Sequence, residues 1–370
     1  MQNKARVFII SWTCTLALIG ASASSAFAQC EYFDHNGSGS IGGNTWVYVL
    51  GQYDTAGPMD VDSSGWVDLR DLLAFIPFFG HDCPAAWHDT TSNHIEGLIL
   101  TEWEVHETEL AGITGNLPAG SITYRLYAEM SHEEDIILAV YGDDEAPLNV
   151  SSDGTFYGFG SESEFGIVVV DSYNPAFNSV FPANAYSTML SCGRVPEEDP
   201  FVGPGTGYVS GWQFPLQDLD DVGDIVLSDT IGGAWFNHFN FISNQQSGLV
   251  FLGQFTIVDG STLEGTLNLL AETTMEIGHG IEIAEGLSFS SNNLDVLGCT
   301  DSDATNYNPA ATIQFGPCFF QGDFNQDGET TIEDLLILLQ QFGCTECPSG
   351  DLNGDGIVGV QDILTFLMLY

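Results

Sequence analysis

A loop followed by an apolar run occurs four times in this chain, and no other feature constrains its fold as strongly. Each loop has acidic, amide or hydroxyl side chains at alternate positions and a glycine at position 6. Counted from position 12, apolar residues recur at +1, +2, +4, +5 and +8, which is one face of a short amphipathic helix. The four sets are Trp46, Val47, Val49, Leu50 and Tyr53; Leu72, Leu73, Phe75, Ile76 and Phe79; Leu335, Leu336, Leu338, Leu339 and Phe342; and Ile363, Leu364, Phe366, Leu367 and Tyr370. Two helices can bury such faces against each other, so each pair of loops is expected to form one small domain.

The two C-terminal loops have the ligand pattern of calcium sites. Calcium takes about six to eight oxygen ligands, which a twelve-residue loop supplies from alternate positions and from its last residue, with glycine at the sharp turn. In loop 323–334 the expected ligands are Asp323, Asn325, Asp327, the Glu329 carbonyl, Thr331 and Asp334. In loop 351–362 they are Asp351, Asn353, Asp355, the Ile357 carbonyl and Asp362. The sequence therefore predicts a pair of calcium sites.

A second pair of loops lies near the N-terminus. In loop 60–71 the expected ligands are Asp60, Asp62, Ser64, the Trp66 carbonyl, Asp68 and Asp71. Loop 34–45 offers Asp34, Asn36 and Ser38 but ends on Thr45, where a carboxylate is expected. We expect this loop to bind calcium weakly or not at all. The alternative for every loop is an ordinary Asp/Gly turn before a helix.

The paired C-terminal segments, 323–342 and 351–370, resemble a type I dockerin module, and segments 34–53 and 60–79 resemble a degenerate copy of it. The resemblance implies two calcium ions per module, docking onto a cohesin receptor, and a role in tethering enzymes of polysaccharide breakdown. The ligands that match the family are Asp323, Asn325, Asp327, Asp334, Asp351, Asn353, Asp355 and Asp362.

The docking positions depart from the dockerin pattern. In that family, positions 10 and 11 are polar, and basic residues follow further along the helix. Here these positions hold Ile332-Glu333 and Val360-Gln361, and neither helix has Lys or Arg. Thr330 at position 8 is a further departure. The resemblance therefore supports calcium ligation more strongly than it supports docking.

The first 28 residues have the pattern of a signal peptide. A short basic region precedes a mostly apolar run at 7–19, and residues 26–28 form a small-x-small cleavage site. Residues 1–28 are therefore expected to be removed and the protein to be secreted. A lipoprotein anchor is a weaker alternative, because Gln29 rather than a small residue precedes Cys30. No later stretch approaches the roughly 20 apolar residues that a membrane-spanning helix needs.

The charge of the chain excludes some partners. It has 51 acidic and 5 basic residues, a formal charge of −46, and only Arg70, Arg125 and Arg194 remain basic after cleavage. Because affinity for phosphate groups depends on Lys and Arg, neither nucleic acid nor an anionic membrane is an expected partner. Divalent cations are the natural counter-ions. The alternative, for carboxylates outside the loops, is a solvated acidic surface suited to salty water.

The middle of the chain, about 95–296, shows the two-residue period of strands. Residues 124, 126, 128 and 130 alternate with a second set, as in a half-buried strand, and similar runs follow at 136–141, 165–170, 224–227, 249–258, 262–270 and 281–288. Turn residues separate these runs, which favours an antiparallel β-sandwich. The expected fold is mostly β, with this sandwich flanked by helical paired-calcium-loop modules at 29–84 and 320–370.

A Cys-bounded segment, 297–319, resembles a short repeat of secreted proteins of marine Bacteroidetes, and the chain as a whole resembles their multi-module exported proteins. We expect Cys299 to pair with Cys318. Asp301, Asp303 and Asn306 are either further oxygen ligands or plain turn residues.

The other cysteines are expected to form disulfides as well, which is the default in exported chains. Cys30 and Cys83 would join the two ends of the N-terminal module. Cys344 and Cys347 would form a short bridge, and Cys192 is left over.

No common catalytic pattern (GxSxG, HExxH or paired CxxC motifs) occurs. The eight histidines are scattered singly, and each is expected to be structural or exposed. The acidic clusters 143–145 and 218–224 could contain a glycosidase pair. Trp103, Trp212 and Trp235 could stack on sugar rings, although most aromatic residues in a sandwich belong to the core.

We therefore expect a secreted calcium-binding multi-module protein that is structural or adhesive, or that is anchored through its dockerin-like modules. The expected partners are calcium ions, with a cohesin-like receptor or an extracellular glycan. The alternative is a carbohydrate-binding or polysaccharide-degrading protein whose central sandwich contacts glycans, a glycoside hydrolase if it is an enzyme.

Overall fold

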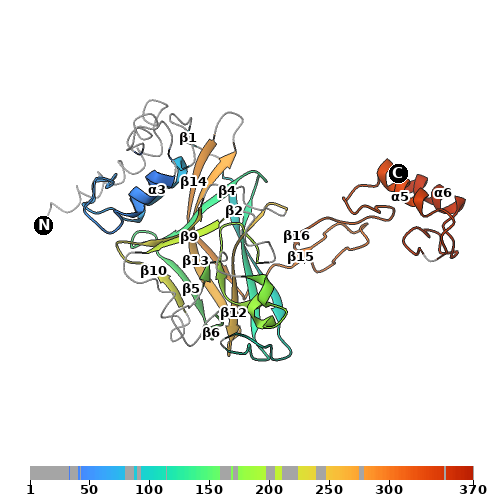
Figure 1. The fold of residues 1–370 in the computed structure, drawn as a ribbon, viewed down its shortest axis with the longest axis horizontal. Helices are drawn as coiled ribbons and strands as arrows, with labels where there is room; N and C mark the ends of the chain where they lie inside the picture. Colours follow the sequence, from blue (N-terminus) through green and yellow to red (C-terminus); the bar gives the residue numbers. More distant parts are fainter. Residues whose placement is uncertain are drawn as a thin grey trace. The chain divides into compact units, whose positions relative to one another are not determined.

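The computed structural model describes residues 33, 41, 43–79, 87–89, 93–113, 115–158, 168–169, 174–196, 205–210, 224–238, 247–274, 279–345 and 347–369. The chain divides into two compact units, Met1–Leu294 and Asp295–Tyr370 (Figure 1). Within the described ranges, no helix combines the length and apolar character needed to cross a bilayer.

Among the described residues of the first unit are two sheets that are antiparallel except for two strand pairs (Figure 1). The larger sheet has the order β1-β14-β13-β4-β11-β9, with β5 beside β13 and β10 beside β5; its strands are β1 Trp87–Asp89, β4 Ile136–Gly142, β5 Leu148–Ser152, β9 Gly205–Ser210, β10 Asp224–Leu227, β11 Gly233–His238, β13 Leu263–Thr274 and β14 His279–Ser290. The smaller sheet has the order β2-β3-β12-β8-β7, with β6 beside β12; its strands are β2 Ile95–Val105, β3 Ile122–Met130, β6 Thr155–Phe156, β7 Val168–Val169, β8 Met189–Leu190 and β12 Leu249–Val258. The parallel pairs are β1 with β14 and β7 with β8. The prediction of a β-rich chain with antiparallel sheets is confirmed.

Both sheets contribute to one buried apolar cluster. Leu126 of β3 and Phe255 of β12 belong to it from the smaller sheet, and Val140 of β4 and Leu269 of β13 from the larger one. Strand β3 is buried on its second face too, which differs from the half-buried strand expected from its alternation. Its Arg125 donates from Nε to Gln254 Oε1 at 3.0 Å.

Strand β12, which pairs with β3, is in turn contacted by a short 3-10 turn, η4 at Pro182–Tyr186. Gln254 Nε2 donates to the carbonyls of Ala185 at 2.9 Å and Ser187 at 3.1 Å. A segment distant in sequence therefore lies against β12, and no two-residue period along a strand could reveal this contact.

The N-terminal helices α3 (Gly43–Leu50) and α4 (Leu69–Phe75) share a second apolar cluster with the larger sheet. Trp46 stacks on Phe75, with ring centroids 5.5 Å apart, and meets Phe236 of β11 edge-on at 5.0 Å. The apolar stripes of these helices therefore pack against each other and also against strands of the same unit. Cys30 and Cys83 lie outside the described residues.

The second unit has helices α5 (Ile332–Gln340) and α6 (Val360–Leu369) and the small strands β15 (Leu297–Gly298) and β16 (Ile313–Gln314). Its buried apolar cluster consists of Leu338, Val358 and Phe366, with a few partly buried neighbours. The disulfides Cys299–Cys318 and Cys344–Cys347 form as expected. Cys192 in the first unit is buried and forms no disulfide with any described residue.

Candidate calcium-binding loops

Three loops share one hydrogen-bond pattern around their first aspartate. The backbone N–H of the glycine at position 6, which has a positive φ, donates to Oδ2 of the aspartate at position 1. The pairs are Gly65 with Asp60 (φ 104°, 2.8 Å), Gly328 with Asp323 (φ 91°, 3.0 Å) and Gly356 with Asp351 (φ 89°, 2.7 Å). Glycine adopts this conformation at little cost, so the chain can turn tightly around its own carboxylate.

The carboxylate at position 12 closes each loop from the first turn of the following helix. In loop 323–334, Oδ1 of the buried Asp334 accepts from the N–H of Phe324 at 2.7 Å and of Asn325 at 3.0 Å, and Oδ2 accepts from Thr331 at 2.8 Å. The equivalent residues Asp71 and Asp362 are also buried and accept from the same parts of their loops. One side chain thus holds both ends of each loop.

Burial and hydrogen bonding act in opposite directions on these carboxyl groups. Burial raises the pKa of Asp71 to about 7, despite its backbone N–H donors. Burial also acts to raise the pKa of Asp334, but its several N–H donors outweigh it and the pKa is lowered. The N–H of Gly359 lowers the pKa of Asp362. The two C-terminal carboxylates therefore hold their charge more readily than Asp71.

Carboxylates that are separated in sequence converge inside two of the loops. Single oxygens of Asp60, Asp62 and Asp71 lie within 4.8 Å of one another, as do those of Asp323, Asp327 and Asp334. In loop 351–362, the N–H of Asp355 joins it to Asp351 Oδ1 at 3.0 Å. Like charges at such distances repel one another. A hard cation that prefers oxygen ligands would remove this repulsion.

The other expected ligands bond mostly to their loop neighbours. In loop 323–334, Asn325 Nδ2 donates to Asp327 Oδ2 at 2.6 Å and the N–H of Glu329 donates to Asp327 Oδ1 at 2.9 Å. In loop 351–362, Asn353 Nδ2 donates to Asp355 Oδ2 at 3.2 Å and the N–H of Ile357 donates to Asp355 Oδ1 at 3.0 Å. In loop 60–71, Ser64 Oγ donates to the Trp66 carbonyl at 2.9 Å. These short contacts keep the oxygens of positions 1 to 7 close together.

In two of the loops, the side chain at position 9 caps the N-terminus of the helix that follows. Asp68 accepts from the N–H of Arg70 at 2.9 Å and caps α4, and Thr331 accepts from Glu333 at 3.3 Å and caps α5. Position 9 often reaches calcium through a water molecule. Capping and ion binding are therefore compatible at this position.

Of loop 34–45, only its last part is described. Asp34, Asn36 and Ser38 lie outside the described residues. Thr45 is buried, at the position where the other loops bury a carboxylate, and its hydroxyl has no hydrogen-bond partner among the described residues. A neutral hydroxyl cannot supply the charge or the two oxygens of a carboxylate.

This difference predicts unequal responses to mutation. We expect Asp355→Ala to weaken one calcium site by more than about tenfold, because affinity in such loops follows the number of charged ligands. Thr45→Val, which keeps the buried volume, is expected to leave calcium binding unchanged. Isothermal titration of the full chain with calcium measures both. Loss of a site in Thr45→Val would show that loop 34–45 binds calcium strongly.

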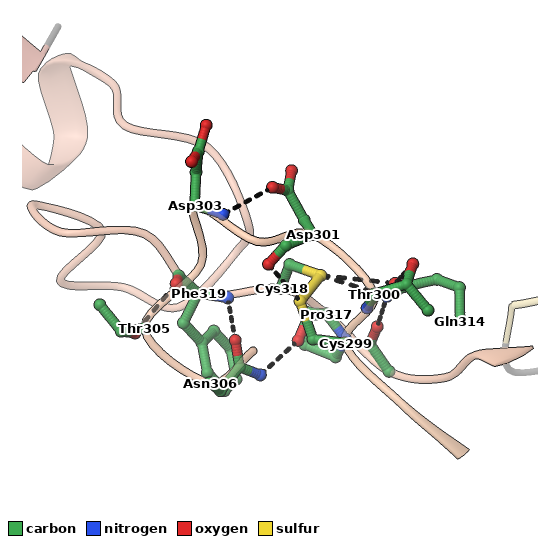
Figure 2. Close-up of a disulfide and its surroundings, with 11 residues drawn as sticks. Cys299, Thr300, Asp301, Asp303, Thr305, Asn306, Gln314, Pro317, Cys318 and Phe319 are labelled. Atoms are coloured by element: carbon green, nitrogen blue, oxygen red, sulfur yellow. Dashed lines mark hydrogen bonds between the residues drawn. A yellow bond between two sulfur atoms is a disulfide. The ribbon is translucent and has the colours of Figure 1, made fainter. Parts of the chain in front are cut away.

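The Cys-bounded segment uses its polar side chains as turn residues (Figure 2). Asn306 Oδ1 accepts from the N–H of Phe319 at 2.8 Å, and its Nδ2 donates to the Pro317 carbonyl at 3.0 Å. Asp301 Oδ1 accepts from the N–H of Asp303 at 2.9 Å. These bonds, together with the disulfide, hold the two ends of the segment side by side.

The candidate glycan and glycosidase residues are mostly engaged elsewhere. Trp235 is 1% exposed and lies in the core, whereas Trp103 is 41% exposed and stacks on Arg125, whose Cζ lies 3.6 Å from the ring centroid. Asp143 is paired with Arg70. Trp212 and residues 218–223 lie outside the described part of the chain.

The sequence-based expectation for the histidines missed one group. His94, His132 and Asp135 lie together, although His94 and Asp135 are 41 residues apart. No spacing rule links these positions. Only the pairing of β2 with β3 and the turn into β4 bring them together.

Comparison with protein-family models, with curated proteins and with solved structures finds no match for this chain.

Proposed function

We propose that this is a secreted calcium-binding anchoring protein whose C-terminal unit docks, when loaded with calcium, onto an apolar β-sheet face of a cohesin-like receptor. In this proposal the two sheets of the first unit form an antiparallel sandwich that the C-terminal unit attaches to its partner. One observation carries the proposal: the same helix positions are buried in the helix after loop 60–71 and exposed in the helices after both C-terminal loops.

The helix after loop 60–71, α4 with the turn that follows it, packs this face on its own chain. Leu69, at position 10 of its loop, is 1% exposed, and Leu73 and Ile76 of the same face are also buried. All three belong to the apolar cluster that includes Leu138 and Phe236 of the larger sheet. A β-sheet face is therefore a physically suitable partner for this kind of helix surface.

The C-terminal copies leave the equivalent face open. Ile332 and Val360, at position 10 of their loops, are 59% and 62% exposed. The other exposed members of the face are Leu336, Leu339, Leu364 and Leu367. Exposed apolar clusters on secreted proteins mark interaction sites, because water solvates them poorly.

The charge of the C-terminal unit indicates what should surround the receptor's apolar face. Residues 295–370 contain no Lys or Arg but many carboxylates, several of them in the loops beside α5 and α6. A receptor face with an apolar centre and a basic rim would complement this surface. Because α5 and α6 carry no Lys or Arg, docking would use their apolar faces in place of the basic residues of the dockerin pattern.

The test measures binding of the full chain to a panel of recombinant cohesin-type domains, with calcium and with a chelator. We expect calcium-dependent binding that Leu336→Asp and Leu364→Asp each weaken by at least about tenfold. A buried Leu contributes about 1.5–3 kcal/mol, and about 1.4 kcal/mol corresponds to tenfold in affinity.

Val47→Asp is the matched control, because Val47 holds the same repeat position in the first loop unit and is already exposed. It should leave binding unchanged. Binding that ignores Leu336→Asp, or that Val47→Asp weakens equally, would place the docking surface elsewhere. No calcium-dependent binding to any member of the panel would reject the anchoring proposal.

A further inference from the structure

A second kind of metal site is suggested by three side chains at one end of the two sheets. His94 Nδ1 lies 2.8 Å from Asp135 Oδ2, and His132 Nδ1 lies 3.9 Å from the same oxygen. The two imidazole rings stack with centroids 4.5 Å apart. One possible ligand atom from each residue lies within 4.8 Å of the other two.

The backbone holds this group in place from several sides. The N–H of Thr274, at the end of β13, donates to Asp135 Oδ1 at 2.6 Å and leaves Oδ2 facing the histidines. The N–H of His94 donates to Glu282 Oε2 at 2.7 Å, and the N–H of Ser131 donates to the His94 carbonyl at 2.8 Å. Strands of both sheets thus position the three side chains.

The separations suit a small tetrahedral ion. Zinc binds imidazole nitrogen and carboxylate oxygen at about 2.0–2.2 Å, so neighbouring ligand atoms around it are about 3.3 Å apart. The separations from Asp135 Oδ2, 2.8 Å to His94 Nδ1 and 3.9 Å to His132 Nδ1, lie on either side of this value. Because a nitrogen lone pair lies in the plane of its imidazole, binding would turn the exposed His132 ring out of its stack on His94 until both nitrogens point at the ion.

The three side chains differ in how far they are exposed to solvent. Asp135 and His94 are buried, whereas the side chain of His132 is 57% exposed. Three protein ligands leave a fourth position for water, and His132 marks the side from which an ion could enter. Glu133 and Glu134, exposed in the same turn, make the entrance negative.

We propose that His94, His132 and Asp135 form a binding site for zinc or a similar divalent transition metal, separate from the calcium loops. Imidazole nitrogen favours such ions, whereas calcium takes oxygen ligands. The ion would replace the proton shared by His94 Nδ1 and Asp135 Oδ2, which passes to solvent. It would also displace the contact of Ser131 Oγ with His132 Nδ1, now 2.9 Å. The bound ion would fasten the start of β2 to the turn between β3 and β4.

The experiment titrates the full chain with zinc while saturating calcium fills the acidic loops. We expect about one zinc ion per chain at this site and, with cobalt in its place, the visible absorption of a tetrahedral nitrogen and oxygen site. His132→Gln should weaken zinc binding by more than about tenfold, since even indirect changes around metal ligands often cost that much.

Glu133→Gln is the matched control: it removes a carboxylate from the same turn and should leave the affinity for zinc within about twofold. Because His132 is largely exposed, its variant should fold, which circular dichroism verifies. Asp135→Asn provides a second variant at the buried ligand and should also weaken binding. Zinc affinity unchanged in His132→Gln and Asp135→Asn, or no zinc bound in the presence of calcium, would overturn the proposal.

Discussion

Removing calcium is expected to unfold the C-terminal unit while the first unit stays folded. The apolar core of the C-terminal unit is small, with Leu338, Val358 and Phe366 at its centre, and its two loops concentrate carboxylates that repel one another without an ion. At a calcium concentration 100 times the Kd, each site contributes about 2.7 kcal/mol. Two sites would contribute about 5 kcal/mol, comparable to the whole stability of a small domain.

Differential scanning calorimetry and circular dichroism of the full chain, with calcium and with EDTA, measure this effect. We expect one thermal transition to move strongly and the helical signal to fall on chelation. Magnesium should restore little, because it requires a tighter octahedral geometry. A flat calorimetric titration at millimolar calcium, or two transitions that do not respond to EDTA, would contradict the calcium assignment.

Arg70→Ala is expected to cost the first unit about 3 kcal/mol, the usual range for leaving one member of a buried ion pair alone. From α4, Arg70 donates from Nη2 to Asp143 Oδ1 at 2.9 Å, and its Nε lies 2.6 Å from Asp143 Oδ2. Its Nη1 lies 3.4 Å from Glu285 of β14. Asp143 is nearly fully buried, so its charge would lose its cationic partner and keep only the N–H donors of Glu145 and Ala146.

Chemical denaturation of Arg70→Ala, Asp143→Ala and the double variant measures this coupling. The double variant should be less destabilised than the sum of the single variants, because the pair is then removed together. Asp144→Ala, which deletes an exposed carboxylate next to Asp143, is the control and should change stability little. Additive effects in the cycle would show that the pair contributes no coupling energy.

The β-rich character of the chain could be predicted because alternation along a strand is a local property. The order of the strands could not, since β13 pairs with β4, β5 and β14, and no local pattern specifies those partners. The buried second face of β3 was missed for the same reason. On that face Arg125 lies against the Trp103 ring and bonds to Gln254, and Gln254 in turn bonds to the carbonyls of residues 185 and 187.

The shape of the loops and the helices after them could be predicted from spacing along the chain. A twelve-residue loop closes on itself, and its glycine and position-12 carboxylate act within one turn. What surrounds the helices depends on distant residues. Leu69 and Ile332 hold the same position in their repeats, but Leu69 is buried and Ile332 is exposed. The tertiary structure alone decided this difference, as it did the pairing of Arg70 with Asp143 and the meeting of His94 with Asp135. In each case the contact depends on which strands the fold brings beside a given loop or helix, and residue spacing carries no information about that.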